Sequence, residues 1–259
     1  MRSDATSTRL GSLVLLRHGE SVGNARGLFT GVLDVDLTPA GEQASRDAGA
    51  RLAAAGFVPD VVVTSELARG WRTAELVVEA LGVTCPLLRR WRLNERSYGA
   101  LSGHRKADVR AAYGTEQFLY WRRSLEGRPP PLDRETLELW GRLSPFDRLP
   151  PEALVGTESL LDVVARLRPW VAEVTEDVRA GRDVLVVAHG NSLRALCAVL
   201  DDLSGEELRR LNIPNARPLR YDVTPGGDGL LRSRIRGGRY LDPDIARVEA
   251  AIIARQGGT

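Results

Sequence analysis

Three short runs of apolar residues stand out along the chain. They cover residues 12–16, 61–64 and 184–188, and each is bounded by polar or turn-forming residues. A continuous apolar run of this length is typical of a strand that is buried on both faces of a parallel sheet. No run approaches the roughly 20 apolar residues that a membrane-spanning helix needs. The pattern therefore predicts buried strands in a globular protein.

Between these runs, apolar residues recur with helical spacing and with start and stop signals. Thr38 and Pro39 favour a helix start, because Thr caps free backbone N–H groups and Pro suits the first turn, and Gly56 marks the stop. Ser159 and Asp162 have the spacing of a capping box at the start of a long helix. Helices are predicted over residues 38–56, 68–81 and 159–180, and from about residue 193 onwards.

Strands that alternate with helices predict an α/β fold with a mainly parallel central sheet and helices on both faces. At 259 residues the chain suits a single domain, 1–259, with an insertion. Residues 91–150 are polar, contain three consecutive prolines and lack strong periodicity, so we interpret them as an insertion that caps one end of the sheet. Residues 1–11 are predicted to be a flexible lead-in, and residues 242–259 a helical tail on the surface.

Composition and charge narrow the possible functions. The net charge is only +2, and the arginines are spread along the whole chain without interleaved aromatic residues, which does not favour nucleic-acid binding. Cys85 and Cys197 lie far apart without metal-ligand spacing, so we expect neither a disulfide framework nor a zinc site. The first apolar stretch is too short for a secretory signal. We therefore expect a cytoplasmic protein without a membrane or nucleic-acid partner.

Two of the three histidines occupy matching positions. His18 and His189 each follow a predicted buried strand directly and precede a glycine. Ligands of open parallel sheets bind beyond the carboxyl ends of the strands, so both rings could face one crevice. The alternative is that each is a hydrogen-bonded structural histidine. We interpret the third, His104, as a surface residue of the insertion.

The residues around His18 suggest an anion site. Arg17 offers a guanidinium fork that matches phosphate oxygens, and Asn24 and Thr30 add neutral donors. Glycines let backbone N–H groups approach an anion closely. The glycines of this stretch are Gly19, Gly23, Gly27 and Gly31. Together these residues describe an anion pocket around a potential nucleophile.

Motifs in a fixed order run along nearly the whole chain, from residue 12 to about residue 241. Two of them surround the histidines, Arg17-His18-Gly19-Glu20 and Ala188-His189-Gly190. The others are Phe29-Thr30-Gly31, Thr64-Ser65-x-Leu67-x-Arg69, Asn94-Glu95-Arg96-x-Tyr98-Gly99, Trp121-Arg122-Arg123, Thr157-Glu158-Ser159-Leu160, His189-Gly190-Asn191-Ser192-Leu193-Arg194 and Leu211-Asn212-Ile213-Pro214. The first two resemble the histidine phosphatase superfamily, and the full set resembles its 2,3-bisphosphoglycerate-dependent phosphoglycerate mutases.

This resemblance implies a phosphoryl transfer through a covalent intermediate. A neutral ring nitrogen of His18 accepts the phosphoryl group and forms phosphohistidine. Arg17, Arg69 and His189 then stabilise the charge on the transferred group, and Glu95 carries the proton of the substrate hydroxyl. These five residues are the implied catalytic set, and no metal ion is expected.

The resemblance also implies a set of substrate-binding residues. Arg122, Arg123, Lys106 and Tyr98 are expected to clamp the carboxylate and the second phosphate of the substrate. The full implied set is Asn24, Thr30, Gly31, Tyr98, Lys106, Arg122, Arg123, Gly190 and Asn191. The implied reaction interconverts 2- and 3-phosphoglycerate in glycolysis and gluconeogenesis, primed by 2,3-bisphosphoglycerate, in a homo-oligomer that is a dimer or a tetramer.

The chain departs from the family pattern at a few positions. Gly23 stands where the family usually has Trp, Asn215-Ala216 replaces a Thr-Gly pair, and Gly156 stands where Leu is more usual. None of these changes removes an implied catalytic group, but they bear on the balance between mutase and phosphatase activity. The alternatives are therefore a phosphatase of the same superfamily that acts on small phosphoesters and a non-catalytic phosphoanion-binding protein.

Overall fold

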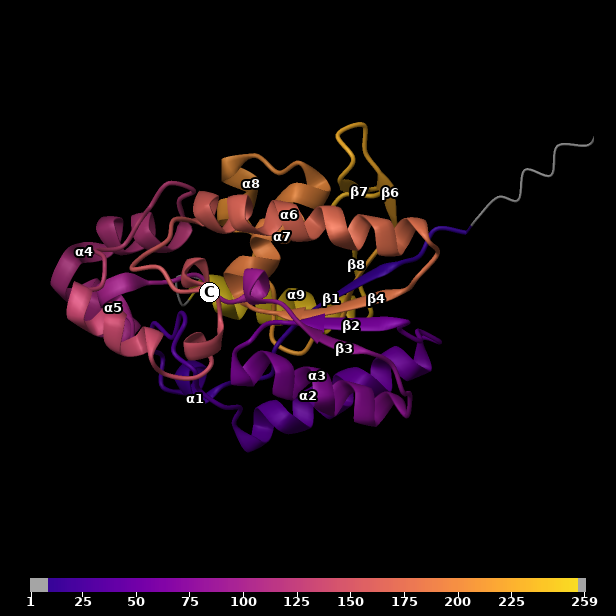
Figure 1. Cartoon of the computed structure of the whole chain (residues 1–259), viewed down its shortest axis with the longest axis horizontal. Coiled ribbons are helices and arrows are strands. Elements are labelled where there is room, and N and C mark those ends of the chain that lie inside the picture. The colour runs from indigo at the N-terminus through magenta and orange to yellow at the C-terminus, as the bar shows by residue number, and fades with distance from the viewer. Residues whose placement is uncertain (1–8, 256–259) are drawn as a thin grey trace, which may run out of the picture.

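A six-stranded sheet forms the centre of the protein (Figure 1). The computed structural model describes residues 9–255. The strand order is β3-β2-β4-β1-β5-β8, in which β3, β2, β4 and β1 run parallel, β5 pairs antiparallel with β1, and β8 pairs antiparallel with β5. The strands of this sheet are β1 (Leu13–Arg17), β2 (Val61–Thr64), β3 (Leu87–Arg89), β4 (Val184–Ala188), β5 (Leu219–Tyr221) and β8 (Arg239–Tyr240).

The three strands that the apolar runs predict are three of the four parallel strands, and all three lie inside the sheet with a neighbour on each side. Every residue of β1, β2 and β4 is buried, as expected for strands covered on both faces. The bounds of β2 and β4 agree with the prediction. Strand β1 lies one residue later, because the backbone pairing of Arg17 with Ala188 extends the ladder beyond the apolar run.

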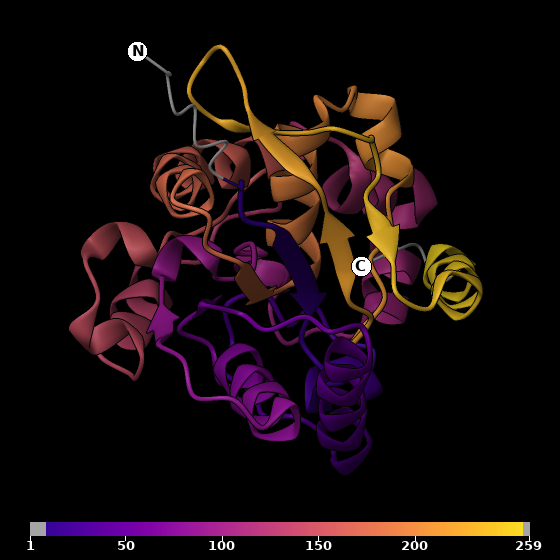
Figure 2. The ribbon, with the colours of Figure 1, turned by 90° about the vertical axis from the view of Figure 1, so that its right-hand side faces the viewer.

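Helices cover both faces of the sheet, which confirms the predicted α/β architecture (Figure 2). Helices α2 (Pro39–Ala54) and α3 (Ala68–Leu81) pack on one face against Val14 and Leu16 of β1. Helices α6 (Leu160–Arg179) and α7 (Gly190–Asp201) pack on the other face. The alternating side chains of each buried strand therefore enter two separate cores.

The predicted helix starts are present as capping interactions. The Thr38 hydroxyl accepts a hydrogen bond from Gly41 N at 3.0 Å, and Ser159 and Asp162 form the reciprocal capping box of α6. Helix α7, in contrast, begins at Gly190, three residues before the predicted start. The earlier start follows because the strand ends at Ala188 and His189 is already the N-terminal cap of the helix.

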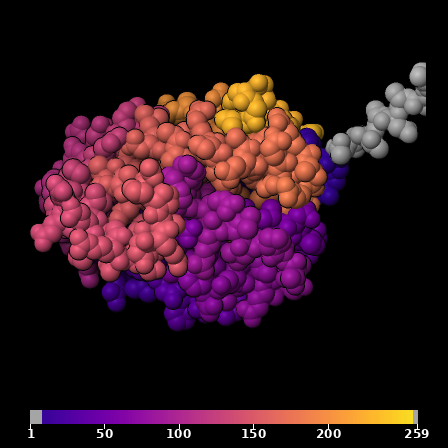
Figure 3. Space-filling model, in the orientation of Figure 1, coloured from indigo at the N-terminus to yellow at the C-terminus, as the bar shows by residue number. Residues whose placement is uncertain are grey.

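The insertion, residues 91–150, lies beyond the carboxyl ends of β1 and β4 (Figure 1). It forms a continuous lobe at that end of the sheet and its covering helices (Figure 3). It contains two helices, α4 (Lys106–Arg123) and α5 (Arg134–Gly141), which the sequence interpretation missed. Helix α4 shows little periodicity because much of its surface is exposed and Gly114, with φ +79°, kinks it. A short helix, α1 (Val22–Ala25), follows β1, and Leu28 just after it pairs with Arg105 of the insertion.

The segment after α7 contributes small elements that no apolar run predicts. They are α8 (Gly205–Arg210), the hairpin β6 (Val223–Pro225) and β7 (Leu231–Ser233), and α9 (Pro243–Arg255). Helix α9 lies within residues 242–259, where a helical tail is predicted, and only Ala246 within it is buried. The flexible lead-in predicted for residues 1–11 falls mostly outside the described residues.

Residues 9–255 contain no membrane-spanning helix, no disulfide and no metal-binding cluster. Within that range no helix is long and apolar enough to span a membrane. Cys85 and Cys197 are both free thiols. The described side chains also contain no cluster of three or more His, Cys, Asp and Glu residues that could hold a metal ion.

Candidate active site

The two strand-end histidines meet at one edge of the sheet. Strands β1 and β4 are parallel neighbours with Arg17 opposite Ala188, so the residue that follows each strand leaves the sheet at the same level. The His18 and His189 ring centroids lie 5.0 Å apart at an interplanar angle of 59°. Both side chains are buried, with exposed fractions of 3% and 0%. The structure therefore brings both rings into one environment.

Hydrogen bonding fixes the tautomer of His18. Its Nδ1 lies 2.6 Å from the carbonyl oxygen of Gly19, and because a carbonyl can only accept, Nδ1 carries the proton. Nε2 then keeps its lone pair. Burial, followed by the charges of Arg69 and Arg17, holds the pKa of His18 well below its usual value. His18 is thus a neutral imidazole with Nε2 available as a nucleophile.

His189 has a different set of contacts. Its Nε2 lies 2.7 Å from the Ser65 hydroxyl, which can donate or accept. Burial, then the charge of Arg69, lowers the pKa of His189 well below its usual value. At neutral pH His189 is therefore also uncharged, and it can act as a neutral hydrogen-bond donor or acceptor beside His18.

Two buried guanidinium groups face the histidines. Arg69 is 1% exposed and donates to the carbonyl oxygens of Leu33 and Gly31 at 2.8 and 2.7 Å. Arg17 donates to the carbonyl oxygen of Ile213 at 2.9 Å, and its buried Nε has no hydrogen-bond partner among residues 9–255. Burial lowers the pKa of Arg69 to about 10, so the group stays charged at neutral pH. Neither arginine forms an ion pair with a carboxylate in the described part of the chain.

Most of the predicted site residues line one small cavity, which we call the inner cavity. Its volume is about 30 Å³, room for only a few water molecules. Its lining contains Lys106, whose pKa is lowered to about 7 by burial and then by Arg122 and Arg17. The residues that line it are Arg17, His18, Asn24, Leu28, Thr30, Gly31, Arg69, Glu95, Tyr98 and Lys106.

Glu95 is tied to the start of α7. Its Oε1 accepts hydrogen bonds from the backbone N–H groups of Arg96 at 2.8 Å and Asn191 at 3.1 Å. Asn191 also donates through Nδ2 to the hydroxyl of Tyr98 at 3.0 Å, and its Oδ1 accepts from Arg194. The predicted residues Gly190 and Asn191 thus form the first turn of a helix whose N–H group orients the carboxylate.

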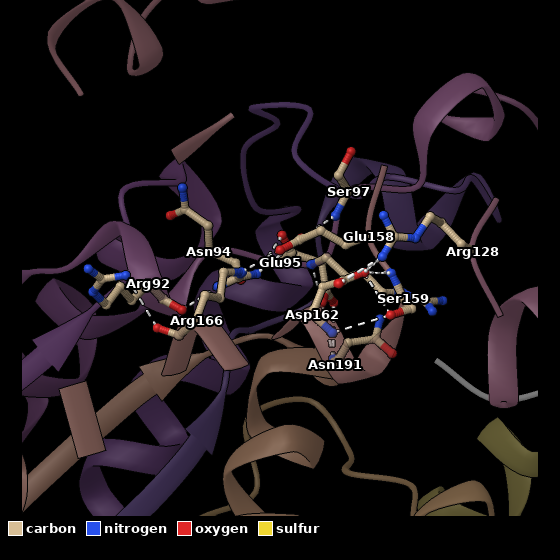
Figure 4. Close-up of polar contacts among 11 residues, drawn as sticks. Arg92, Asn94, Glu95, Ser97, Arg128, Glu158, Ser159, Asp162, Arg166 and Asn191 are labelled. Carbon is tan, nitrogen blue, oxygen red and sulfur yellow. Dashed lines mark hydrogen bonds and ion pairs between the residues drawn. The ribbon is translucent and has the colours of Figure 1, made fainter. Parts of the chain in front are cut away.

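A buried ion pair behind Glu95 holds the loop that carries it (Figure 4). Arg166 of α6 donates to Glu158 Oε1 at 2.6 Å, and Glu158 Oε2 accepts from Ser97 N at 2.9 Å. The same guanidinium donates to the backbone carbonyls of residues 92, 94 and 95. The paired side chains are only 12% and 7% exposed. We call this arrangement the Arg166–Glu158 clamp.

Sequence reasoning missed Arg166, although Glu158 lies in one of the quoted motifs. The available signal is an arginine on a face of α6 that otherwise buries Val163, Leu167 and Trp170. A charged residue with its polar atoms half-buried in such a helix needs polar partners, and the backbone of residues 92–95 provides them.

The four residues that are predicted to hold the substrate carboxylate and second phosphate lie in different places in the structure. Tyr98 and Lys106 line the inner cavity, whereas Arg122 and Arg123 do not. Arg122 is fully buried, with its guanidinium 5.5 Å from the centroid of the Phe29 ring and 5.2 Å from that of Phe118. Arg123 lines a separate, larger hollow. His104 is exposed, as predicted.

Gly23, one of the departures from the family pattern, is in contact with the site. A Cβ atom at this position would lie 2.3 Å from the hydroxyl oxygen of Thr30, which lines the inner cavity. A larger residue therefore requires the Thr30 side chain or the loop to shift. The glycine lets this loop approach the cavity wall closely.

Comparison with known proteins agrees with this geometry. The sequence profile described as histidine phosphatase superfamily (branch 1) matches residues 13–148 and 133–235, which together include both histidines. The chain belongs to the histidine phosphatase superfamily. Its resemblance to that superfamily, predicted from the motifs around His18 and His189, is thereby confirmed.

Sequence relatives place the chain in one family within this superfamily. A 2,3-bisphosphoglycerate-dependent phosphoglycerate mutase of Thermobifida fusca is 48% identical over 250 residues, covering 96% of this chain and 100% of that protein. A protein of the same name from Mycobacterium tuberculosis is 48% identical over 253 residues, covering 95% and 98%. The chain therefore belongs to the family that carries this name.

Solved structures include relatives with a different activity in their names. A mycobacterial glucosyl-3-phosphoglycerate phosphatase matches with a TM-score of 0.66 and 26% identity, covering 89% of this chain and 100% of that one. The fold and the superfamily are thus shared with a phosphatase as well as with the mutases.

Proposed function

We propose that the protein interconverts 2- and 3-phosphoglycerate through a phosphohistidine at His18, primed by 2,3-bisphosphoglycerate, in glycolysis and gluconeogenesis. One observation carries the proposal: a neutral imidazole with a free Nε2 shares a small cavity with two buried guanidinium groups and one carboxylate. The family membership at 48% identity supports the substrate assignment.

Once primed, the enzyme carries the phosphoryl group on His18. In the first transfer the substrate hydroxyl gives its proton to Glu95 while its oxygen takes the phosphoryl group, and the phosphorus–nitrogen bond to His18 Nε2 breaks. In the second transfer His18 Nε2 attacks the other phosphorus atom in line with its leaving oxygen, a nitrogen–phosphorus bond forms as the phosphorus–oxygen bond breaks, and the leaving oxygen takes the proton from Glu95. Acceptor and donor oxygens belong to different carbons, so the sum of the two transfers is an isomerisation.

The charges in the cavity suit this transfer. The transition state spreads negative charge over three equatorial oxygens. Arg17 and Arg69 face that region as preorganised cations, and His189 can donate a neutral hydrogen bond. Preorganised donors of this kind are typically worth about 3–4 kcal/mol each. In this scheme the two arginines supply the positive charge, so no step calls for a metal ion.

The cavity lining also suits a polyanionic primer. Arg17, Arg69 and Lys106 face a single carboxylate, Glu95, so the site carries an excess of positive charge. When bound, 2,3-bisphosphoglycerate supplies the phosphoryl group that first charges His18. Lys106 and Tyr98 are in reach of the rest of such a molecule, while Arg122 acts from behind the aromatic rings of Phe29 and Phe118.

A second candidate function is hydrolysis of a small phosphoester. The likeness to glucosyl-3-phosphoglycerate phosphatase favours it, because the same phosphohistidine becomes a phosphatase intermediate once water reaches it. The two functions differ only in which acceptor oxygen enters the cavity.

A coupled assay on 3-phosphoglycerate separates the two functions. We expect 2-phosphoglycerate to form only when 2,3-bisphosphoglycerate is present, with little release of inorganic phosphate and no effect of a chelator. Phosphate release at a rate that rivals isomerisation would defeat the mutase assignment in favour of the phosphatase.

We further propose a cytoplasmic homo-oligomer, a dimer or a tetramer, on the basis of the family resemblance. Sedimentation velocity at micromolar concentration tests the oligomeric state, and a monomeric species would overturn it.

A further inference from the structure

Another hollow, different from the one that Arg123 lines, lies next to the inner cavity, and we call it the outer hollow. Its volume is about 550 Å³, compared with about 30 Å³ for the inner cavity. Lys106 lines both spaces, so its side chain stands in the wall between them. A phosphorylated three-carbon acid is much larger than the inner cavity, so it has to approach His18 through a wider space. The outer hollow is such a space, because it shares Lys106 with the inner cavity.

The outer hollow is lined by positive charge. Arg26 from the end of α1, Arg105 and Arg110 around the start of α4, and Lys106 all line it, and no Asp or Glu does. All three arginines are exposed. None of the four cations forms an ion pair with a carboxylate within residues 9–255.

Single exposed arginines without an ion pair also occur elsewhere in residues 9–255, for example Arg168 and Arg234, while others are paired, such as Arg134 with Glu138. The outer hollow differs because four cations line one concave space that has no acidic side chain in its wall. Four unpaired cations around one concave space repel one another, and an anion in that space relieves the repulsion. A concave site lined by one sign of charge also concentrates oppositely charged ligands.

The frame of the outer hollow is well defined. The segment after α1 pairs with the segment before α4 through the bridge between Leu28 and Arg105 and a hydrogen bond from Lys106 N to Gly27 O at 2.9 Å. The Arg110 guanidinium lies 5.4 Å from the centroid of the Phe118 ring, which limits the directions it can take. The cations are thus presented on paired backbone.

We propose that the outer hollow is a second anion-binding site, which captures phosphorylated carboxylates and passes them by Lys106 into the inner cavity. The proposal goes beyond the chemistry at His18 and relies on the proposed function only for the identity of the anion. The position of Lys106 fits this role, because burial, followed by the charges of Arg122 and Arg17, lowers its pKa to about 7, and an arriving anion favours its charged form.

The test is the salt dependence of His18 phosphorylation by 2,3-bisphosphoglycerate in single-turnover experiments. The variant Arg26→Gln/Arg105→Gln/Arg110→Gln is compared with the control Arg168→Gln/Arg234→Gln/Arg239→Gln, which removes the same charge from exposed positions outside both cavities. At low salt we expect the second-order rate constant of the first variant to fall about tenfold, with a flatter salt dependence and a maximal rate within about twofold of the wild type. We expect the control to stay close to the wild type.

The charge-preserving variant Arg26→Lys/Arg105→Lys/Arg110→Lys separates charge from packing. It should restore most of the rate and of the salt dependence. Equal rate constants for the first variant and the control, or a lowered maximal rate with an unchanged salt dependence, would overturn the proposal.

Two further measurements distinguish a failure of the outer-hollow proposal from a failure of the proposed function. If the wild type takes no phosphoryl group from 2,3-bisphosphoglycerate but hydrolyses p-nitrophenyl phosphate, the mutase assignment fails, and the same variants are compared on kcat/KM for that ester. Titration with inorganic phosphate by calorimetry should show weaker binding for the first variant than for the control. Equal binding counts against the outer hollow whatever the activity.

Discussion

His18 and His189 are carried by paired strands, whereas Glu95 is carried by a loop that a buried ion pair holds in place. In the strand half of the site, the backbone hydrogen bonds of the ladder between β1 and β4 set the position at which each histidine leaves the sheet. In the loop half, residues 92–97, the backbone carbonyls and Ser97 N depend on the Arg166–Glu158 clamp. The proposed catalytic residues are thus positioned in two ways, by backbone pairing and by a side-chain ion pair, and the second is the more sensitive to side-chain substitution.

The two halves also differ in their electrostatics. Arg17 and Arg69 in the strand half are buried without a carboxylate partner in residues 9–255, which is costly unless an anion binds. Arg166 in the loop half is neutralised by Glu158 at 2.6 Å. In the proposed function the two unpaired cations bind the phosphate of the ligand, whereas the paired Arg166 supports the loop.

The largest effect is expected in the strand half, from His18→Ala. The substitution removes the atom that accepts the phosphoryl group, so turnover should fall by about 10⁴-fold or more while substrate still binds. Phosphoenzyme trapping and steady-state assays measure this. His104→Ala is the matched control, since His104 is exposed and should leave activity unchanged. Appreciable phosphorylation of the His18→Ala protein would contradict the scheme.

In the loop half, Glu95→Gln should slow turnover by about 10²–10⁴-fold, the usual contribution of a positioned acid or base. Binding should change far less, because an amide oxygen can still accept from Arg96 N and Asn191 N. Comparison of kcat with the dissociation constant of 3-phosphoglycerate measures the split. Glu126→Gln, at an exposed position of the insertion, serves as the control. An unchanged kcat would mean that another group carries the proton.

The strand half could be predicted from the sequence alone, and the loop half could not. Residues 12–16 and 184–188 are mostly apolar because they are buried on both faces, and a histidine directly after such a strand must lie at the end of the sheet. Glu95 has no such signal, and only the family resemblance pointed to it. Strands β3 and β8 lack the signal as well, because they are short edge strands with partly exposed residues.

The features that the sequence does not predict, the Arg166–Glu158 clamp and helix α4, share a physical cause. The clamp depends on contacts between α6 and a loop that lies about 70 positions earlier in the chain, with Arg166 and Asn94 separated by 72 residues. No local period records such a contact. Helix α4 was missed for a related reason, since its stability comes from packing in the insertion and not from an amphipathic repeat.

Arg166→Gln tests the sensitivity of the loop half directly. It leaves Glu158 buried without its partner and frees three backbone carbonyls, so the free energy of unfolding should fall by about 3 kcal/mol. We also expect kcat to fall by about tenfold, with a smaller change in KM, because Glu95 loses its fixed position. Urea unfolding and steady-state kinetics measure both.

A surface pair provides the comparison for that variant. Arg134→Gln breaks an exposed pair with Glu138 and should change the free energy of unfolding by less than about 0.5 kcal/mol without altering kcat. Partial recovery of kcat in Arg166→Lys is expected, since a lysine keeps the charge but loses the fork. An Arg166→Gln enzyme with wild-type kcat would show that the clamp does not position Glu95.

The pH dependence probes the strand half. Because the pKa values of His18 and His189 are lowered by burial and by the neighbouring arginines, the unfolded chain binds protons near pH 6.5 that the folded protein does not. The stability from these two residues is therefore complete above about pH 6.5 and is lost as the pH falls toward their folded pKa values. Nitrogen NMR of the ligand-free protein should show both rings neutral at pH 6.5, with the His18 proton on Nδ1. Protonated rings at that pH would refute the assignment.

The smallest effect is expected for Asn215→Ala, which removes a side-chain support from the strand half. Asn215 Nδ2 donates to the carbonyl oxygen of His18 at 2.6 Å, at a position where the family usually has Thr. Its loss should lower the free energy of unfolding by about 1 kcal/mol, the usual contribution of one such hydrogen bond. Because the pairing of β1 with β4 still fixes His18, kcat should stay within about threefold, whereas Arg166→Gln lowers it further. Thermal unfolding and the coupled assay measure both, and a loss of kcat equal to that of Arg166→Gln would mean that side chains, and not the ladder, position the nucleophile.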